Sequence, residues 1–196
     1  MVGYFERLWS ELPEGPPERF AERRDFLIEA VADAQKVIDV GCGAGWFCEA
    51  LQSAGAQVVG VDVAGEAIRR ARQRCPDVEF ALVDGTRLPY VESSFDAAWL
   101  GETLEHVQDG IALLEEIGRV LKPGARLIGT TPNHGPWQRL RLGLSARAFE
   151  EHFEPRSDHV RFFTTATLRT LLEVCGYERT EIRAQRGDLF FTTAVR

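Results

Sequence analysis

A glycine-rich turn follows residues 37–40, an apolar run typical of a short buried strand. Gly41, Gly43 and Gly45 occupy alternate positions of this turn, and Trp46 comes next. Glycines between a strand and a helix let a ligand approach the backbone and expose amide N–H groups at the helix start. The dinucleotide-binding fingerprint needs a further glycine where Trp46 stands, so this spacing indicates a different ligand.

Three aspartates stand where successive expected strands end. Asp39 lies in the first strand, Asp62 ends the second and Asp84 follows the third. Open α/β sheets bind ligands at the carboxyl ends of their strands, so these carboxylates should surround one site. Asp39 suits an ammonium group, Asp62 the hydroxyls of a ribose, and Asp84 an adenine amino group. One such aspartate is commonly a turn or cap residue, but all three with the glycine turn indicate a nucleoside site.

The elements that would position these residues alternate regularly along the chain. Short apolar runs typical of buried strands alternate with stretches whose apolar residues have helical spacing. This order predicts an α/β fold with a doubly wound, mostly parallel sheet covered on both faces. The chain ends in two further strand-like runs around a predicted hairpin turn at 186–188. The expected strands are 37–40, 58–62, 78–83, 95–100, 125–130, 177–184 and 189–195.

The 196 residues suit one domain, since single cores usually comprise about 100–200 residues. Residues 1–35 contain a lead-in, expected to be irregular over 1–17, and an amphipathic helix. Residues 36–132 hold the alternating strands and helices. Residues 133–163 interrupt this pattern, and residues 164–196 are expected to form a last helix and the hairpin.

Composition excludes several classes of protein. The net charge of −7 argues against nonspecific binding to nucleic acid. No run approaches the roughly 18 consecutive apolar residues of a membrane-spanning helix, and no apolar signal-peptide core precedes the first strand. The four cysteines lack metal-ligand spacing, which is typical of reduced thiols. We therefore expect a cytoplasmic protein with no membrane span and no nucleic-acid partner.

Four motifs, in this order, carry a resemblance to a known family. They are VIDVGCGAGWF, VVGVDVAGEAIRRAR, VDGTRLPYVESSFDAAWLGETLEHV and LEEIGRVLKPGARLIGTTPN. In them the chain resembles the class I S-adenosylmethionine (SAM)-dependent methyltransferases of small molecules, and it is similar to the ubiquinone-pathway O-methyltransferases. The resemblance covers about residues 36–132 strongly and 160–195 more loosely. The resemblance implies a seven-stranded Rossmann-like sheet with an antiparallel last strand. It also implies SAM as the cofactor and S-adenosylhomocysteine (SAH) as its product.

The resemblance further implies which residues contact the cofactor. The glycine turn and Asp39 would hold the methionine moiety, and Asp62 would accept hydrogen bonds from the ribose hydroxyls. Val63 would lie against the adenine, Asp84 and the glycine after it would bind the adenine edge, and Leu100 would line the sulfonium end. The full set is Asp39, Gly41, Cys42, Gly43, Gly45, Asp62, Val63, Asp84, Gly85, Thr86 and Leu100.

All four histidines follow the expected fourth strand, on the side where the acceptor should lie. Methyl transfer needs a base only if the nucleophile loses a proton, as a phenol or catechol does. Histidine is the usual proton acceptor at neutral pH. His106 and His134 are the candidate catalytic bases because they follow the fourth and fifth strands closely.

A second set of residues could hold a divalent metal. On a helix, Glu102, Glu105 and His106 would share one face at positions i, i+3 and i+4. Such a set could bind Mg²⁺ or a transition metal that orients a catechol. The simpler interpretation is a solvated helix face with His106 near the cofactor, and we expect no metal site.

The sequence thus predicts a methyltransferase that acts on a small-molecule acceptor, at oxygen, as a monomer or homodimer. Residues 133–163 would form the acceptor side and its lid. Two alternatives stay open, namely a protein or RNA methyltransferase that uses a partner for recognition and a non-catalytic SAM-binding module. The aromatic residues expected in the lid are Trp137, Phe149, Phe153, Phe162 and Phe163.

Overall fold

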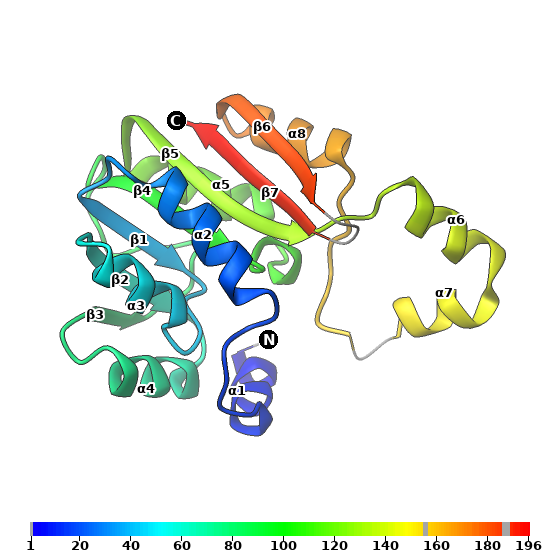
Figure 1. The fold of residues 1–196 in the computed structure, drawn as a ribbon, viewed down its shortest axis with the longest axis horizontal. Helices are drawn as coiled ribbons and strands as arrows, with labels where there is room; N and C mark the ends of the chain where they lie inside the picture. Colours follow the sequence, from blue (N-terminus) through cyan, green and yellow to red (C-terminus); the bar gives the residue numbers. More distant parts are fainter. Residues whose placement is uncertain (1, 155–156, 186–188) are drawn as a thin grey trace.

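A seven-stranded sheet forms the centre of the computed structural model, which describes residues 2–154, 157–185 and 189–196 (Figure 1). The strands are β1 (Lys36–Val40), β2 (Gln57–Asp62), β3 (Glu79–Leu82), β4 (Phe95–Gly101), β5 (Leu121–Pro132), β6 (Glu178–Gln185) and β7 (Leu189–Val195). Their order across the sheet is β3-β2-β1-β4-β5-β7-β6. All seven predicted strands are present, and β5 begins earlier than expected.

The directions of the strands confirm the predicted fold class. β1 pairs in parallel with β2 and β4, β2 with β3, and β4 with β5. The last strand, β7, is antiparallel to both of its neighbours, β5 and β6. The turn predicted at 186–188 lies outside the described residues.

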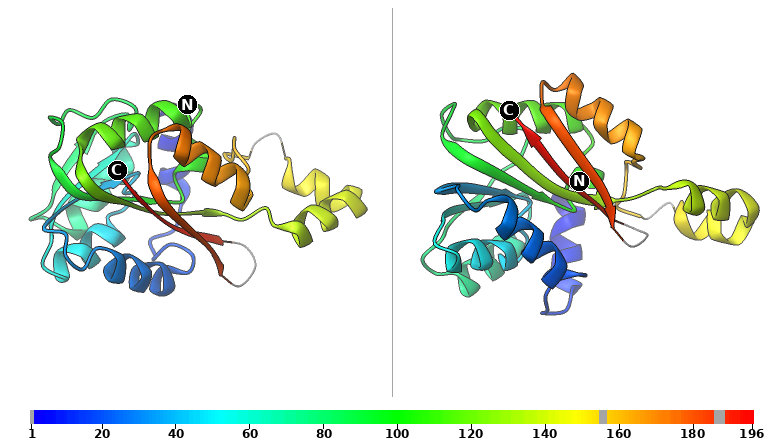
Figure 2. Two further views of the ribbon diagram at one scale, coloured as in Figure 1. Left: turned by 90° about the horizontal axis from the view of Figure 1, so that it is seen from above. Right: turned by 45° about the horizontal axis from the view of Figure 1, so that its top comes forward.

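Helices cover both faces of the sheet, as the alternating pattern predicts. They are α2 (Phe20–Ala30), α3 (Trp46–Ser53), α4 (Gly65–Arg74), α5 (Gly110–Val120) and α8 (Thr165–Val174). Successive side chains of a strand point to opposite faces, so Val37 packs with Leu27 and Leu51 while Ile38 packs with Leu113 and Leu168. The sheet therefore lies between α5 and α8 on one face and α2, α3 and α4 on the other (Figure 2).

The N-terminal segment differs from the prediction. Residues 1–17 are not irregular throughout, because α1 (Val2–Glu11) is a helix that packs beside α4 (Figure 1). The prolines that indicated irregular structure, Pro13, Pro16 and Pro17, all come after this helix. A proline disfavours helical structure at the residue before it but does not prevent a helix further upstream. The helix α1 therefore ends before this segment.

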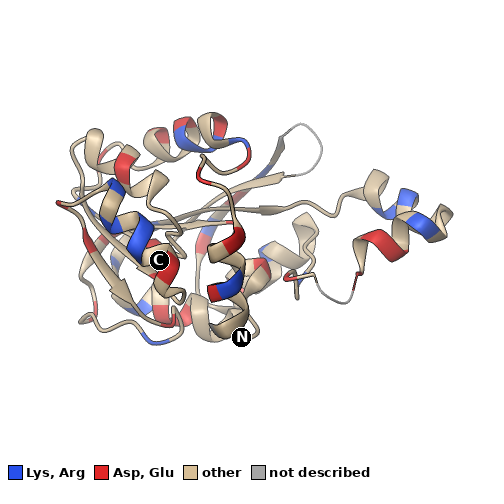
Figure 3. Cartoon of the chain, turned by 90° about the horizontal axis from the view of Figure 1, so that it is seen from below, with Lys and Arg blue, Asp and Glu red and all other residues tan. Residues whose placement is uncertain are grey.

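Residues that follow β5 form an arm that projects from the sheet (Figure 2). It consists of α6 (Pro136–Leu144) and α7 (Ala146–His152). Its helices carry both charge signs (Figure 3), and Arg147 and Glu151 form an ion pair of 2.7 Å along α7. Among the described residues, no helix combines the length and apolar character needed to cross a membrane.

Candidate functional site

The glycine turn after β1 has a backbone that strongly favours glycine. Gly41, Gly43 and Gly45 have φ angles of 78°, 52° and 79°, in the left-handed region. A Cβ atom on Gly41 would lie 2.3 Å from Oγ1 of Thr103, and one on Gly43 would lie 2.7 Å from the Trp9 ring. Neighbouring side chains thus approach this turn where a Cβ would stand, so packing as well as backbone geometry requires glycine.

Asp62, at the end of β2, is fixed by backbone amides on both sides. The Gly43 amide donates to Oδ2 and the Ala64 amide donates to Oδ1, each at 2.9 Å. Burial raises the pKa of Asp62, and these two hydrogen bonds oppose that shift. Each carboxylate oxygen has two lone pairs, so both retain an acceptor position for a hydroxyl group.

A cavity of about 650 Å³ opens at the carboxyl ends of the parallel strands. This volume lies within the range of small-molecule sites, which is about 300–1,000 Å³. The turn and the β2 end contribute Gly41, Asp62 and Val63 to its wall, and the β3 end contributes the segment from Asp84. The structure therefore brings together six of the predicted cofactor residues: Gly41, Asp62, Val63, Asp84, Gly85 and Thr86.

The segment after β3 is held by a local turn. The Thr86 amide and hydroxyl both donate to Oδ1 of Asp84, at 2.9 and 2.8 Å. A Cβ atom on Gly85 would lie 2.8 Å from a methyl group of Leu113. The absence of a side chain at Gly85 lets α5 approach this edge of the cavity.

The other predicted cofactor residues lie elsewhere. Asp39 is 1% exposed and accepts a hydrogen bond from Cys48 Sγ at 3.2 Å, and burial raises its pKa to about 7. Leu100 is 4% exposed in the hydrophobic core. Five of the predicted cofactor residues do not line the described cavity: Asp39, Cys42, Gly43, Gly45 and Leu100. Contacts between these five residues and the cofactor therefore stay predictions.

His106 lines the same cavity as the aspartates and is positioned by Asp158. Its Nδ1 atom is 3.3 Å from Oδ2 of Asp158 and 3.1 Å from the Asp158 carbonyl oxygen. Both residues line the cavity, as does His159, whose ring meets that of His106 edge-on at 4.8 Å. A hydrogen bond at Nδ1 leaves Nε2 of His106 as the nitrogen available to accept a proton.

The expected helix face with Glu102, Glu105 and His106 does not form. Glu102 has a φ of 55°, which no right-handed helix accommodates, and only a 3₁₀ turn, η1 (Leu104–His106), follows. The structure instead brings Glu105 and His106 to His159, with one potential ligand atom from each residue within 4.8 Å of the others. Burial and the charge of Glu102 raise the pKa of Glu105 to about 8, and a protonated carboxyl group is a poor metal ligand.

Glu105 belongs to a buried polar cluster beside the cavity. It is 1% exposed, and its Oε2 accepts a hydrogen bond from the Thr131 hydroxyl at 2.9 Å. Oε1 has no hydrogen-bond partner among the described residues and lies 4.0 Å from Nε2 of His106. Arg23 of α2 is also buried and lowers the pKa of both Glu102 and Glu105, although burial raises each of them more. Because the carbonyl oxygen of Glu105 also accepts from Val160 and Arg161, η1 is tied to the segment that carries His159.

His134 lies apart from the cavity. It is 6% exposed, and its Nε2 atom is 3.0 Å from Nε2 of His152 at the end of α7. The strand β5 continues to Pro132, and His134, which follows it, does not line the cavity. A role of His134 as a base therefore has no geometric support here. The aromatic residues expected in a lid also lie outside the described cavity lining, and Trp137 is 82% exposed on the arm.

A wall of the cavity that sequence reasoning missed comes from α1. Phe5, Leu8, Trp9 and Leu12 all line the cavity. Their spacing of i, i+3, i+4 and i+7 is the pattern of an amphipathic helix, and this was the signal available in the sequence.

Parts of the chain are similar to known methyltransferases. Residues 38–129 match the model of the family described as "Methyltransferase domain". The chain is 38% identical over 107 residues to a demethylmenaquinone methyltransferase of Paenarthrobacter aurescens, covering 54% of this chain and 42% of that protein. It is 37% identical over 122 residues to a ubiquinone biosynthesis O-methyltransferase of Xanthomonas campestris, covering 58% and 50%. The chain thus spans about half the length of these relatives.

A solved structure extends the similarity across most of the chain. It is described as a SAM-dependent methyltransferase from Methanosarcina mazei, is 25% identical and has a TM-score of 0.67. The alignment covers 87% of this chain and 96% of that one. Residues 38–129 thus match a methyltransferase domain, and most of the chain has the fold of a SAM-dependent methyltransferase.

Proposed function

We propose that this protein transfers the methyl group of SAM to an oxygen atom of a small molecule. The observation that carries the proposal is the shared cavity: Asp62 and Asp84 line it together with His106 and Asp158. A cofactor held by the aspartates would therefore share one cavity with a potential proton acceptor.

The residues present fit the cofactor of this family. Asp62 offers acceptor positions to a ribose, Val63 offers an apolar surface to adenine, and the turn at Gly41 exposes backbone where a side chain would not fit. The bound cofactor supplies an electrophilic methyl group on a sulfonium. Holding a nucleophile in line with that group can lower the barrier by up to ~7–11 kcal/mol in favourable intramolecular cases, so positioning is the first task of these walls.

His106 would act as the general base. Asp158 holds Nδ1 and with it the orientation of the ring, so that Nε2 can take a proton from an acceptor hydroxyl. His106 is the member of the predicted pair that lines the cavity, so the proposal rests on His106 and not on His134.

A hydroxylated aromatic ring is the acceptor class we favour. One relative is named for O-methylation in ubiquinone biosynthesis, and another is named for methylation of demethylmenaquinone. The cavity also presents apolar side chains, among them Leu8, Val107 and Leu113, beside His106, which suits a ring that carries a hydroxyl group.

Transfer of label from methyl-labelled SAM to a panel of phenols and catechols tests the proposal. Label in a small molecule, dependent on His106, would support it. Label that enters only protein or RNA of a lysate would contradict it and favour an enzyme that recognises its substrate through a partner. SAH binding without transfer to any acceptor would contradict it in favour of a SAM-binding module.

A further inference from the structure

The helix α1 encloses the cofactor side of the cavity through one apolar face. Phe5, Leu8 and Trp9 are half-buried, and each lines the same cavity as Asp62. Ring carbons of Trp9 lie 2.7 Å from where a Cβ atom of Gly43 would be, so the indole covers the glycine turn. Part of the cofactor site is therefore covered by a helix that precedes the whole sheet in sequence.

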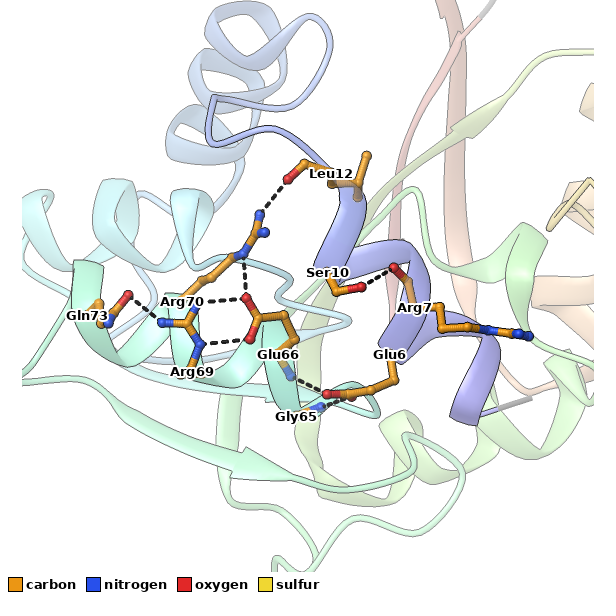
Figure 4. Close-up of polar contacts among 9 residues, drawn as sticks. All are labelled: Glu6, Arg7, Ser10, Leu12, Gly65, Glu66, Arg69, Arg70 and Gln73. Atoms are coloured by element: carbon orange, nitrogen blue, oxygen red, sulfur yellow. Dashed lines mark hydrogen bonds and ion pairs between the residues drawn. The ribbon is translucent and has the colours of Figure 1, made fainter.

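Glu6, at the side of the apolar face of α1, attaches this helix to the start of α4. The amides of Gly65 and Glu66 donate to the two carboxylate oxygens of Glu6, at 2.7 and 3.1 Å (Figure 4). The first amides of a helix are usually capped by a serine, threonine, aspartate or asparagine at the N-cap position. Here that position is Ala64, which has no side-chain acceptor, so Glu6 supplies the cap from another helix.

A second attachment joins the far end of α1 to the same helix. Arg70 donates through Nη1 to the carbonyl oxygen of Leu12 at 2.9 Å and through Nε to Glu66 at 3.0 Å (Figure 4). Glu66 also accepts two hydrogen bonds from Arg69. Both attachments of α1 thus converge on the first two turns of α4, which directly follow Asp62 and Val63.

These attachments suit a reversible contact. Glu6 and the amides it caps are exposed to solvent, where charged contacts are individually weak. The segment between α1 and α2 contains Pro13, Gly15 and Pro16, which are all exposed. No sheet hydrogen bond ties α1 to the core in the described part of the chain, so α1 can leave its place without disturbing any strand.

We propose that α1 is the lid of the cofactor site and that Glu6 is its latch, which sets how fast SAM and SAH enter and leave. The inference rests on the proposed cofactor site. When Glu6 releases the α4 amides, α1 lifts Trp9 away from the glycine turn and opens the cavity beside Asp62. When Glu6 caps α4 again, the apolar face of α1 closes over the bound molecule.

Dissociation of SAH, followed by stopped-flow displacement, tests the latch. Glu6→Gln keeps an acceptor for one of the two α4 amides and loses the other hydrogen bond. It should therefore raise the dissociation rate about five-fold, the factor that corresponds to loss of one typical helix-cap contact. Glu11→Gln is the matched control, because Glu11 is an exposed glutamate on the same helix, and it should leave the rate unchanged. Equal rates in the two variants would overturn the proposal.

A second variant separates the latch from a merely structural cap. Ala64→Ser gives α4 a cap of its own, so in the Glu6→Gln background it should restore the melting temperature while SAH still leaves rapidly. If the dissociation rate returns to that of the parent protein together with the melting temperature, Glu6 acts only by ordering α4 and the lid is overturned. Failure of the unmodified protein to bind SAH would instead overturn the proposed cofactor site and, with it, this inference.

Discussion

His106 and Asp158 are 52 residues apart in the sequence, yet Nδ1 of the histidine lies 3.3 Å from Oδ2 of the aspartate. The contact forms because the carbonyl oxygen of Glu105 accepts hydrogen bonds from the amides of Val160 and Arg161, which brings the two segments together. The Arg161 guanidinium also donates to the carbonyl oxygens of Val107 and Gln108. Hydrogen bonds to backbone carbonyl oxygens, between the segments that carry His106 and Asp158, thus hold these two residues together.

Substitution of this pair should lower turnover without lowering cofactor affinity. General bases contribute about 10²–10⁴-fold, so His106→Ala should reduce kcat by that order. Asp158→Asn should reduce kcat less, by roughly ten-fold, since the ring keeps a hydrogen-bond partner but loses the charge that favours its protonated form. SAH affinity by calorimetry should stay within about two-fold in both variants. A loss of SAH binding that parallels the loss of kcat would assign the pair to the cofactor.

Substitution of Asp62 should abolish tight cofactor binding. Hydrogen bonds to a charged group contribute ~1.5–3 kcal/mol each, so loss of two from a ribose predicts at least about 100-fold weaker SAH binding in Asp62→Ala. Asp62→Asn keeps the shape and one acceptor and should bind with intermediate affinity. The exposed Asp77→Ala is the control, with unchanged affinity expected. Unchanged calorimetric affinity in Asp62→Ala would remove this residue from the cofactor site.

The His134–His152 pair should make the protein less stable in mild acid. Burial lowers the pKa of both histidines. The charge of protonated His152 lowers the pKa of His134 further, and the charge of Arg141 does the same for His152. The unfolded chain, with histidine pKa values near ~6.5, therefore binds more protons than the folded chain as the pH falls below that value. The contribution of the two histidines to the free energy of unfolding is therefore at its full value above about pH 6.5 and declines progressively toward pH 5.

Melting temperatures between pH 5 and pH 8 measure this effect. His152→Gln should flatten the dependence below pH 7, because one of the two titrating rings is removed. Arg147→Gln on the same helix should keep the dependence of the unmodified protein. An identical acid slope in His152→Gln would show that the pair does not control it.

Glu105 should make the opposite contribution. Its pKa is raised to about 8, so the folded chain holds a proton that the unfolded chain releases near pH 4.5, and stability declines as the pH rises through that interval. Glu105→Gln, which keeps an acceptor for the Thr131 hydroxyl, should remove this decline. Denaturant unfolding at pH 6 and pH 8.5 compares the two proteins. A slope that survives the substitution would assign the decline to other groups.

Chelation tests the role of the Glu105, His106 and His159 cluster. We expect the purified protein to hold no stoichiometric divalent ion at neutral pH and to keep its activity in EDTA, because Glu105 is mostly protonated there. Elemental analysis and activity after dialysis against EDTA measure both. A stoichiometric metal that is lost in Glu105→Gln would show that His106 is a ligand and not a free base.

Much of the fold could be predicted because its signals are local. The apolar runs of β1 and β2, the glycine turn and the helical spacing of α5 are each complete within a dozen residues. Once a parallel sheet is predicted, Asp62 and Asp84 must lie at one edge of it, because the carboxyl ends of parallel strands meet there. The cofactor side of the cavity follows from these two steps.

The acceptor side could not be predicted in this way. Sequence proximity to a strand end placed His134 in the site, but the length of β5 carries it away to His152. Helical spacing grouped Glu102 with Glu105, but the positive φ of Glu102 turns the chain and His159 takes its place in the cluster.

The sequence by itself therefore determined the α/β class, the succession of strands and helices in the cofactor half and the acids around the turn. Each of these depends on local periodicity and on the rules of parallel sheets. Only the tertiary structure decided that Asp158 orients His106 and that α1 covers the glycine turn with Trp9. Those contacts join segments far apart in the chain. Their partners are selected by packing and hydrogen bonding in three dimensions, which no local pattern encodes.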